Sequence, residues 1–157
     1  MKTIKSSEII DDLKKLGIKR NDVVHVRAKL SEIGHIDGGA STFINALMEL
    51  LGDGGTIVAL AFTSGAFIRK PRKEDFFHTH QKSYVGSVPN EMINRSNSFR
   101  SKHPMCSFVA IGKHAEEIVS NHDHNSPAFE PVRKIVELQG KFIVIGCVNS
   151  NPGFTFT

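Results

Sequence analysis

The amino-acid sequence predicts an α/β fold, a layered and largely parallel sheet flanked by helices. Apolar runs rich in β-branched residues alternate with amphipathic segments along the 157 residues. The runs "VVHVRA", "GGTIVALAF" and "KFIVIGCV" show little polar alternation, which is typical of strands buried on both faces of a parallel sheet. No internal repeat or linker divides the chain, so we predict a single α/β domain over residues 1–157.

The first expected helix is "SSEIIDDLKKLG", with Ser6 as the predicted N-cap and Gly17 as the stop. Its apolar residues recur at helical spacing: Ile9, Ile10, Leu13 and Leu16. After the strand "VVHVRA", a second helix is expected in "STFINALMELLG". Its predicted core face consists of Phe43, Ile44, Leu47, Met48 and Leu51. The strand "GGTIVALAF" completes this first unit.

The second half of the chain repeats the alternation. We expect a short helix in "VPNEMINRS", a strand in "SFVAIG", helices in "HAEEIVSNH" and near "PVRKIVELQG", and a last strand in "KFIVIGCV". Residues 64–86 show no periodicity and exceed the ~12–15 residues at which a loop without structure becomes unusual. We therefore predict a flap on the substrate side over this range.

Composition excludes several classes of partner. The formal net charge is +4, and residues 64–86 hold five Lys or Arg against two acidic residues, a local patch that is read as a solvated loop. One Tyr and no Trp leave little for base stacking, so no nucleic-acid partner is expected. No run approaches the ~20 apolar residues of a membrane span, and the N-terminus lacks a signal-peptide pattern. A cytoplasmic protein is predicted, with Cys106 and Cys147 as free thiols.

Several motifs admit more than one interpretation. The two His-x-His pairs, residues 78–80 and 122–124, resemble metal ligands but lack the i, i+4 spacing of a zincin helix, so surface residues are favoured and no metal is predicted. The glycines of "HIDGGAST" can cradle an anion before a helix or form an ordinary turn. Cys106 and Ser107 lack a nucleophile elbow. Cys106 is interpreted as a packed thiol and Ser107 as a hydrogen-bonding group at a strand start.

The stretch "RSKHPMCSFVAIG", residues 100–112, places three groups that are or can be cationic ahead of a strand. Arg100, Lys102 and His103 could together grip a phosphate or a carboxylate. A solvated turn explains the same pattern equally well, and local reasoning leaves the two open.

Taken together and in order, these segments resemble the aminoglycoside 3-N-acetyltransferase family, from about Ile9 to Thr157. The most specific element has the pattern RSxHPxxSFxAxG. It is matched here by Arg100, Ser101, His103, Pro104, Ser107, Phe108, Ala110 and Gly112. The resemblance implies acetyl transfer from acetyl-CoA, as co-substrate, to an amine of an aminoglycoside or related amino sugar. It implies direct transfer with general-base assistance and no covalent enzyme intermediate.

The resemblance also implies where acetyl-CoA binds. The stretch after Arg100 would line the cofactor cleft, with Ser107 donating a hydrogen bond to the cofactor, and the turn before the second helix would approach the pantetheine arm. The predicted cofactor-binding residues are Lys29, Ile33, Gly34, His35, Gly38, Gly39, Arg100, His103 and Ser107. The general-base histidine of the family would lie beyond Thr157, so no catalytic residue is assigned and the domain is expected to be C-terminally incomplete.

One segment departs from the family pattern. Residues 26–30 read "VRAKL" where relatives usually read "VHSSL", so two cations and a methyl replace a histidine and two hydroxyls. Lys29 could compensate by contacting a phosphate. The departure leaves open an alternative function, a non-catalytic CoA-binding or interaction domain. An apolar sheet edge could also recruit a second copy and form a homodimer.

Overall fold

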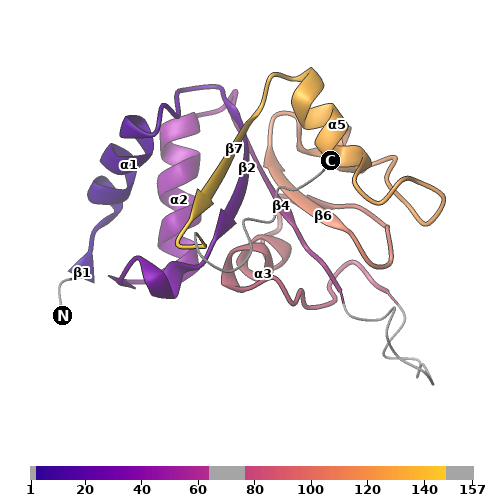
Figure 1. Ribbon diagram of the computed structural model, residues 1–157, viewed down its shortest axis with the longest axis horizontal. Helices are drawn as coiled ribbons and strands as arrows, with labels where there is room; N and C mark the ends of the chain where they lie inside the picture. Colours follow the sequence, from indigo (N-terminus) through magenta and orange to yellow (C-terminus); the bar gives the residue numbers. More distant parts are fainter. Residues whose placement is uncertain (1–2, 64–76, 148–157) are drawn as a thin grey trace.

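The computed structural model describes residues 3–63 and 77–147, and helices and strands alternate along them as predicted. Figure 1 shows their arrangement. In chain order the elements are β1 (Thr3–Ile4), α1 (Ser6–Lys15), β2 (Val23–Ala28), the 3-10 turn η1 (Leu30–Glu32), β3 (His35–Ile36), α2 (Gly39–Leu51), β4 (Thr56–Leu60), α3 (Ser87–Ile93), β5 (Ser98–Arg100), β6 (Phe108–Gly112), α4 (Ala115–Val119), α5 (Glu130–Glu137) and β7 (Lys141–Ile145).

Five strands form one mixed sheet in the order β5-β6-β4-β2-β7. β2 pairs in parallel with β4 and β7, whereas β6 pairs antiparallel with β4 and β5. The α/β class is confirmed, and the sheet is mixed where a largely parallel one was predicted. The sheet is mixed because of β5, a strand that was not predicted from the sequence. Only residues 101–107 connect β5 to β6, and this connection is too short for the crossover of a dozen or more residues that a parallel pair needs, so the two strands pair antiparallel.

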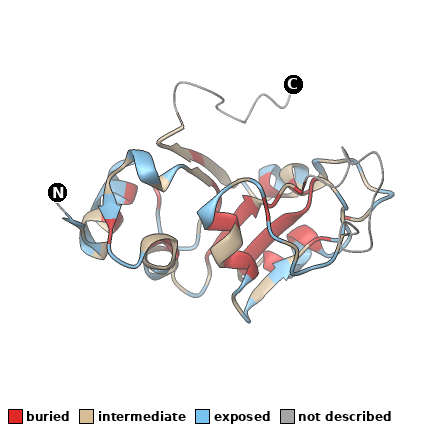
Figure 2. Ribbon diagram, turned by 90° about the horizontal axis from the view of Figure 1, so that it is seen from below, coloured by how far each residue is buried: buried red, intermediate tan, exposed pale blue. Residues whose placement is uncertain are grey.

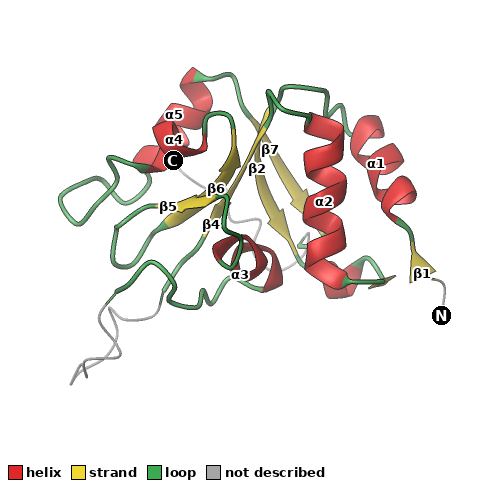
Figure 3. Cartoon of the chain, turned by 180° about the vertical axis from the view of Figure 1, so that it is seen from behind, coloured by secondary structure: helices red, strands yellow, loops and turns green. Residues whose placement is uncertain are grey.

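The sheet is covered on both faces, as the continuous apolar runs predicted. Helices α1, α2 and α3 lie on one face and α4 and α5 on the other (Figure 3). Neighbouring residues of β4 point to opposite sides, so Ile57 packs with the first group of helices and Val58 with the second. Figure 2 shows the buried residues concentrated in the central strands and the helix faces against them. This burial fixes the strand ends that form the site.

The start of α1 differs from the prediction. The helix begins at Ser6 and its N-cap is Lys5, whose backbone is extended, so Ser6 is not the cap. The Lys5 backbone N–H donates to the Glu8 carboxylate at 3.0 Å. Because the Glu8 carboxylate accepts the N–H of the N-cap residue, the start of the helix is stabilised without the Ser6 hydroxyl. The predicted stop is confirmed: Gly17 has a φ of +86°.

Helix α2 buries the predicted face but starts earlier than expected. Phe43, Ile44, Leu47 and Leu51 are buried, and Met48 packs partly against them. The N-cap is Gly38, with a φ of +75°, and a Cβ there would lie 2.5 Å from Thr42 Oγ1. Only glycine meets both requirements, so the "DGG" turn sets the position of the helix start.

Two further expectations concern the segment before α3 and the membrane. The predicted flap spans 64–86, of which residues 64–76 lie outside the described residues. In the described remainder, residues 77–86, the Tyr84 N–H donates to the carbonyl of Phe62, just beyond the end of β4, at 2.9 Å. Among the described residues no helix is both long and apolar enough to cross a bilayer.

Candidate functional site

The site is built along the edge of the sheet that is formed by the carboxyl ends of β2, β4 and β7. Ala28 pairs with Ile145, which brings the exits of β2 and β7 together. Leu60 pairs with Phe108, so the antiparallel β6 starts where β4 ends. Ligands of α/β proteins bind outside the carboxyl ends of such strands. The turn after β2, the start of α2 and the 100–107 loop therefore all lie close to one edge.

Three adjoining cavities occupy this edge. A polar cavity of about 960 Å³ lies between the start of α2, residues 81–84 and α3. A connecting cavity of about 330 Å³ lies over residues 27–31, and an apolar pocket of about 290 Å³ lies between the ends of β2 and β4. Gly86 and Ser87 line both the polar and the connecting cavities, and Val85 lines both the connecting cavity and the apolar pocket. We call this series the strand-end groove.

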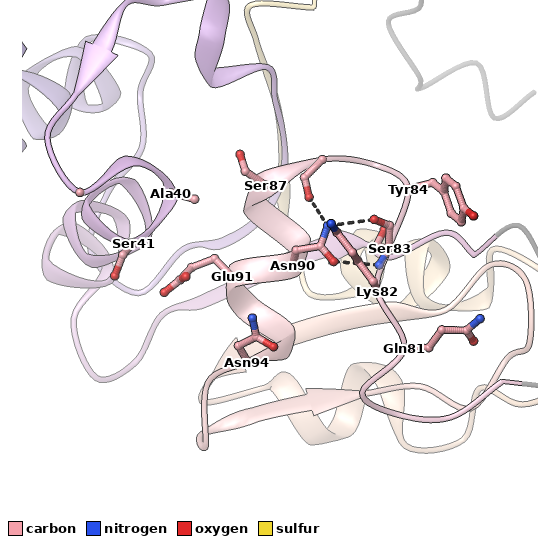
Figure 4. Close-up of a pocket in the computed structure, with 12 residues that line it drawn as sticks. Ala40, Ser41, Gln81, Lys82, Ser83, Tyr84, Ser87, Asn90, Glu91 and Asn94 are labelled. Carbon is pink, nitrogen blue, oxygen red and sulfur yellow. Dashed lines mark hydrogen bonds between the residues drawn. The ribbon is translucent and has the colours of Figure 1, made fainter. Parts of the chain in front are cut away.

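Hydroxyl and amide groups line the polar cavity (Figure 4). Ser41 comes from α2, Ser83 from the segment before α3, and Asn90 and Glu91 from α3. The Glu91 carboxylate is held by Arg95 at 3.2 Å. Such a lining suits a ligand that carries many hydroxyl or amide groups, since each can find a partner.

Asn90 holds the segment that divides the groove. Its side-chain nitrogen donates to the Ser83 carbonyl at 2.9 Å and to the Gly86 carbonyl at 2.7 Å, and its oxygen accepts the Ser83 N–H at 2.8 Å (Figure 4). The Ser83 hydroxyl in turn donates to the Phe62 carbonyl at 3.1 Å and accepts the Val85 N–H at 3.1 Å. One amide therefore fixes both ends of residues 83–86, whose side chains and backbone separate the three cavities.

Arg100 and Ser107, both predicted to bind the cofactor, lie together beside the groove. Arg100 Nε donates to Ser107 Oγ at 3.2 Å, and its other nitrogens donate to the carbonyls of Thr79 (2.9 Å), Gln81 and Ala61 (3.2 Å). Burial lowers the pKa of Arg100 to about 10, which leaves it charged at neutral pH. The guanidinium thus ties residues 79–81, of which Gln81 lines the polar cavity, to the end of β4.

Ser107 is fully buried, and its hydroxyl donates to the Ala61 carbonyl at 2.8 Å. The interpretation of this serine as a hydrogen-bonding group at a strand start is confirmed, because β6 begins at the next residue. Its neighbour Cys106 is 3% exposed, as a packed thiol should be, and burial raises the pKa of that thiol.

His103 and His122 stack at a centroid distance of 4.8 Å behind the 100–107 loop. His103 Nδ1 accepts the backbone N–H groups of Met105 (3.3 Å) and Cys106 (3.0 Å). His122 Nδ1 lies 2.9 Å from the Ser101 hydroxyl. Desolvation lowers the pKa of both imidazoles, so both are neutral near pH 7. The Nδ1 atom of each ring therefore shapes the loop.

Lys29 and the turn before α2 are the remaining predicted cofactor-binding positions. Lys29 lines the connecting cavity, with its ammonium 2.7 Å from the Glu32 carboxylate. Gly38 lines the polar cavity and Gly39 is the first residue of α2. Ile33 instead packs towards α1, on the side away from the groove.

The last two positions of this turn lie beside β1. Gly34, with a φ of +118°, would bring a Cβ within 3.2 Å of Ile4, and His35 pairs with Thr3 in the small sheet. The structure therefore brings Lys29 and Gly38 to the groove and turns Ile33, Gly34 and His35 towards the β1 side. Cofactor binding by all nine residues stays a prediction.

The apolar pocket ends on His25, in the middle of β2. This imidazole is 3% exposed and lies between the rings of Phe108 (6.0 Å) and Phe142 (5.3 Å). Desolvation, with a smaller contribution from the charge of Arg27, lowers the pKa of His25 to about 4. A neutral ring thus belongs to the lining of a largely apolar pocket.

The two His-x-His pairs lie apart from the groove lining. His78 and His80 are exposed, while His122 is buried beneath its neighbour His103. Over residues 3–63 and 77–147, no three His, Cys, Asp or Glu side chains come together as a metal-binding group.

The residues that divide the groove were not predicted from the sequence. Val85, Gly86 and Ser87 line two cavities each, and Asn90 fixes them, yet the sequence placed them only in a flap and a short helix. An Asn at the start of a helix has many roles, and its partners here are backbone groups that every residue carries. The available signal was positional: residues 85–90 form the segment "VGSVPN", where a loop enters a helix.

Comparison with known proteins gives one consistent result. The model of the family described as aminoglycoside 3-N-acetyltransferase matches residues 24–154. Aminoglycoside N(3)-acetyltransferase IX of Micromonospora chalcea is 29% identical over 157 aligned positions, covering 89% of this chain and 56% of the relative.

Solved structures that share the fold include two complexes. AAC-IIIb, determined as a binary complex with CoASH, superposes with a TM-score of 0.78 at 26% identity, over 91% of this chain and 59% of the other. The acetyltransferase AAC(3)-IVa in complex with apramycin gives 0.77 at 28% identity, over 92% and 57%. The chain thus spans little more than half the length of the proteins it matches.

Proposed function

Because the chain belongs to the aminoglycoside 3-N-acetyltransferase family, we propose that it binds acetyl-CoA in the strand-end groove and serves acetyl transfer to an aminoglycoside or related amino sugar. The observation that carries the proposal is the groove itself. It lies at the carboxyl ends of β2, β4 and β7 and is lined by two of the predicted cofactor-binding residues, Lys29 and Gly38. The CoASH complex of one structural neighbour supports the same ligand class.

The reaction transfers the acyl group directly from one substrate to the other, without a covalent enzyme intermediate. The neutral amine nitrogen attacks the thioester carbonyl carbon, the C–N bond forms, the C–S bond breaks, and the amine proton leaves through a base while the CoA sulfur departs. Hydrogen-bond donors must stabilise the oxyanion in between. We assign no base among the described histidines: His103 Nδ1 accepts two backbone N–H groups, and His25 is buried with a pKa of about 4.

The groove suits acyl-CoA. The polar cavity offers hydroxyl and amide partners to the nucleotide end of the cofactor, and the connecting cavity leads from it past Gly86 to the strand ends. The assignment of an aminoglycoside as acceptor rests on the family and on the apramycin complex of a neighbour.

A specific observation favours a second function, a non-catalytic CoA-binding domain. The cations predicted to meet phosphates are engaged within the protein, Lys29 by Glu32 and Arg100 by three carbonyls and Ser107. A chain that binds the pantetheine arm with these groups otherwise occupied would hold CoA without turning it over.

The test uses Cys147, a half-buried thiol that lines the connecting cavity, whereas Cys106 is buried. Alkylation of Cys147 by a maleimide should be slowed at least fivefold by saturating acetyl-CoA, and the Cys147→Ser variant should incorporate no label on this timescale. An alkylation rate that acetyl-CoA leaves unchanged, together with no heat of binding in calorimetry, would overturn the proposal. Release of CoA thiol that depends on added aminoglycoside selects the transferase, and protection without release selects the binding domain.

A further inference from the structure

We propose that the apolar pocket receives the acyl group of the thioester and accepts acyl chains longer than acetyl. The inference rests on the proposed function, because it assumes that the strand-end groove binds acyl-CoA. It adds what that function leaves open, namely which acyl donors the site accepts and which residues decide it.

The order of the three cavities gives the ligand its direction. The polar cavity and the apolar pocket share no lining residue, and each is joined to the connecting cavity by its own set. Gly86 and Ser87 are shared on one side, and Arg27, Ala28 and Val85 on the other. A ligand with a charged nucleotide at one end and an acyl group at the other fits this order in one direction only. Phosphates would lose their hydration without compensation in an apolar pocket, whereas an acyl chain gains by entering it.

The walls of the pocket are those of a site for an aliphatic chain. Leu60 and Phe62 come from the end of β4, Val85 from the segment that Asn90 holds, Val88 from the first turn of α3, and Phe129 from the N-cap of α5. An acyl chain in the pocket would therefore be surrounded by side chains from both faces of the sheet. Such enclosure is how small-molecule pockets bury most of a ligand.

Few polar groups interrupt this lining. Over the described residues, Arg27 and His25 are the titratable side chains in it. Arg27 is partly buried, whereas His25 is 3% exposed and neutral near pH 7. The thioester carbonyl next to the acyl chain can thus meet the cationic side chain of Arg27, while the deeper part of the pocket stays uncharged.

The size of the pocket exceeds the needs of acetyl. Its volume of about 290 Å³ is several times the roughly 30 Å³ that one water molecule occupies in the liquid. An acetyl group, with two carbons and one oxygen, leaves most of it empty. Each methylene added to the acyl chain should then bury apolar surface and tighten binding about fourfold.

The experiment is a calorimetric titration of CoA, acetyl-CoA, propionyl-CoA and butyryl-CoA into the 157-residue chain. We expect butyryl-CoA to bind about fifteenfold more tightly than acetyl-CoA, from two added methylenes. The variant Val85→Phe fills the pocket and should bring this ratio to about one or below. Val136→Phe, the same exchange at a site on α5 that is 60% exposed, should keep the wild-type ratio. Leu60→Phe, at a residue that lines the apolar pocket and not the connecting cavity, should do the same with CoA affinity kept within about twofold, and it replaces Val85→Phe if that variant fails to fold by circular dichroism.

The outcomes separate this inference from the function it rests on. Equal affinity of the wild-type chain for all acyl-CoAs, with CoA bound, overturns the acyl pocket and leaves the proposed function standing. If affinity still rises with acyl-chain length in both Val85→Phe and Leu60→Phe, the acyl group binds elsewhere, and the acyl pocket is overturned as well. A folded chain that binds none of the four ligands contradicts both proposals.

Discussion

Arg100 and Ser107 share one acceptor, the backbone carbonyl of Ala61, which receives the serine hydroxyl at 2.8 Å and a guanidinium nitrogen at 3.2 Å. The two side chains also bond to each other, Nε to Oγ, at 3.2 Å. This arrangement joins β4, the start of β6 and the chain before α3 at the edge where the groove lies. The residues that resemblance implies for the cofactor therefore position the walls of its proposed site.

Substitution of Arg100 by alanine should destabilise the fold. The change removes the donors of several partly buried carbonyls, so we expect a loss of about 3 kcal/mol in the free energy of unfolding. For a chain of this size that corresponds to a fall of about 6 to 12 °C in Tm. Arg100→Lys should not restore stability, since one ammonium cannot reach the same set of acceptors.

Thermal denaturation checks this, with Arg133→Ala as the control. Arg133 is an exposed arginine on α5 that pairs with Glu130 and Glu137, where ion pairs contribute little. An Arg100→Ala protein that keeps the wild-type Tm but binds CoA tenfold more weakly would contradict the positioning role and identify Arg100 as a phosphate contact.

Arg100 and Ser107 should be energetically coupled. Ser107→Ala alone should cost about 1 to 2 kcal/mol, because it removes both hydrogen bonds of a buried hydroxyl, the one donated to the Ala61 carbonyl and the one accepted from Arg100. In the double variant the two losses should not add, and a coupling of at least about 0.5 kcal/mol is expected for side chains in one network. Urea unfolding of the four proteins measures it. Strict additivity would show that the 3.2 Å contact is energetically silent.

His25 should make the folded chain sensitive to mild acid. Its pKa is about 4 when folded and about 6.5 when unfolded, so between these values the unfolded chain binds the extra proton. Stability is therefore greatest above pH 6.5 and falls as the pH drops towards 4, by about 1.5 kcal/mol from this group between pH 6.5 and 5.

The control is His25→Phe, whose aromatic ring can occupy the place between Phe108 and Phe142 without titrating. His103 and His122 also have lowered pKa values and act in the same direction in both proteins. The difference between the two slopes of unfolding free energy against pH therefore isolates His25. Identical slopes would show that the imidazole is not desolvated as the structure indicates.

Asn90→Asp should loosen residues 83–86. The carboxylate cannot donate to the Ser83 and Gly86 carbonyls, and its charge is placed against them. We expect at least tenfold faster amide hydrogen exchange at Val85, with weaker CoA binding. Asn94→Asp is the matched control, because it adds the same charge at the same cavity from the C-cap of the same helix, and its side chain is exposed. Equal effects of the two variants would point to charge alone.

Periodic patterns carried most of the fold prediction. The α2 face of Phe43, Ile44, Leu47 and Leu51 was recognisable because apolar residues at helical spacing must be buried together. The mixed direction of the sheet was missed because β5 has three residues, too few for any period. The direction of β6 follows from the short connection between β5 and β6, and without β5 that connection could not be recognised in the sequence.

The candidate site shows the same division. Sequence alone determined the family, the α/β class, the glycine turn at Gly38 and the chemistry available at Arg100 and Ser107, since these depend on residue identity and local spacing. Only the tertiary structure decided what those groups contact. The hydrogen-bond partners of Arg100 lie 7 to 39 positions away in sequence, and all but Ser107 are backbone carbonyls, which look alike at every position of a sequence. Which carbonyl comes within reach of a guanidinium is set by how the strands end and pair.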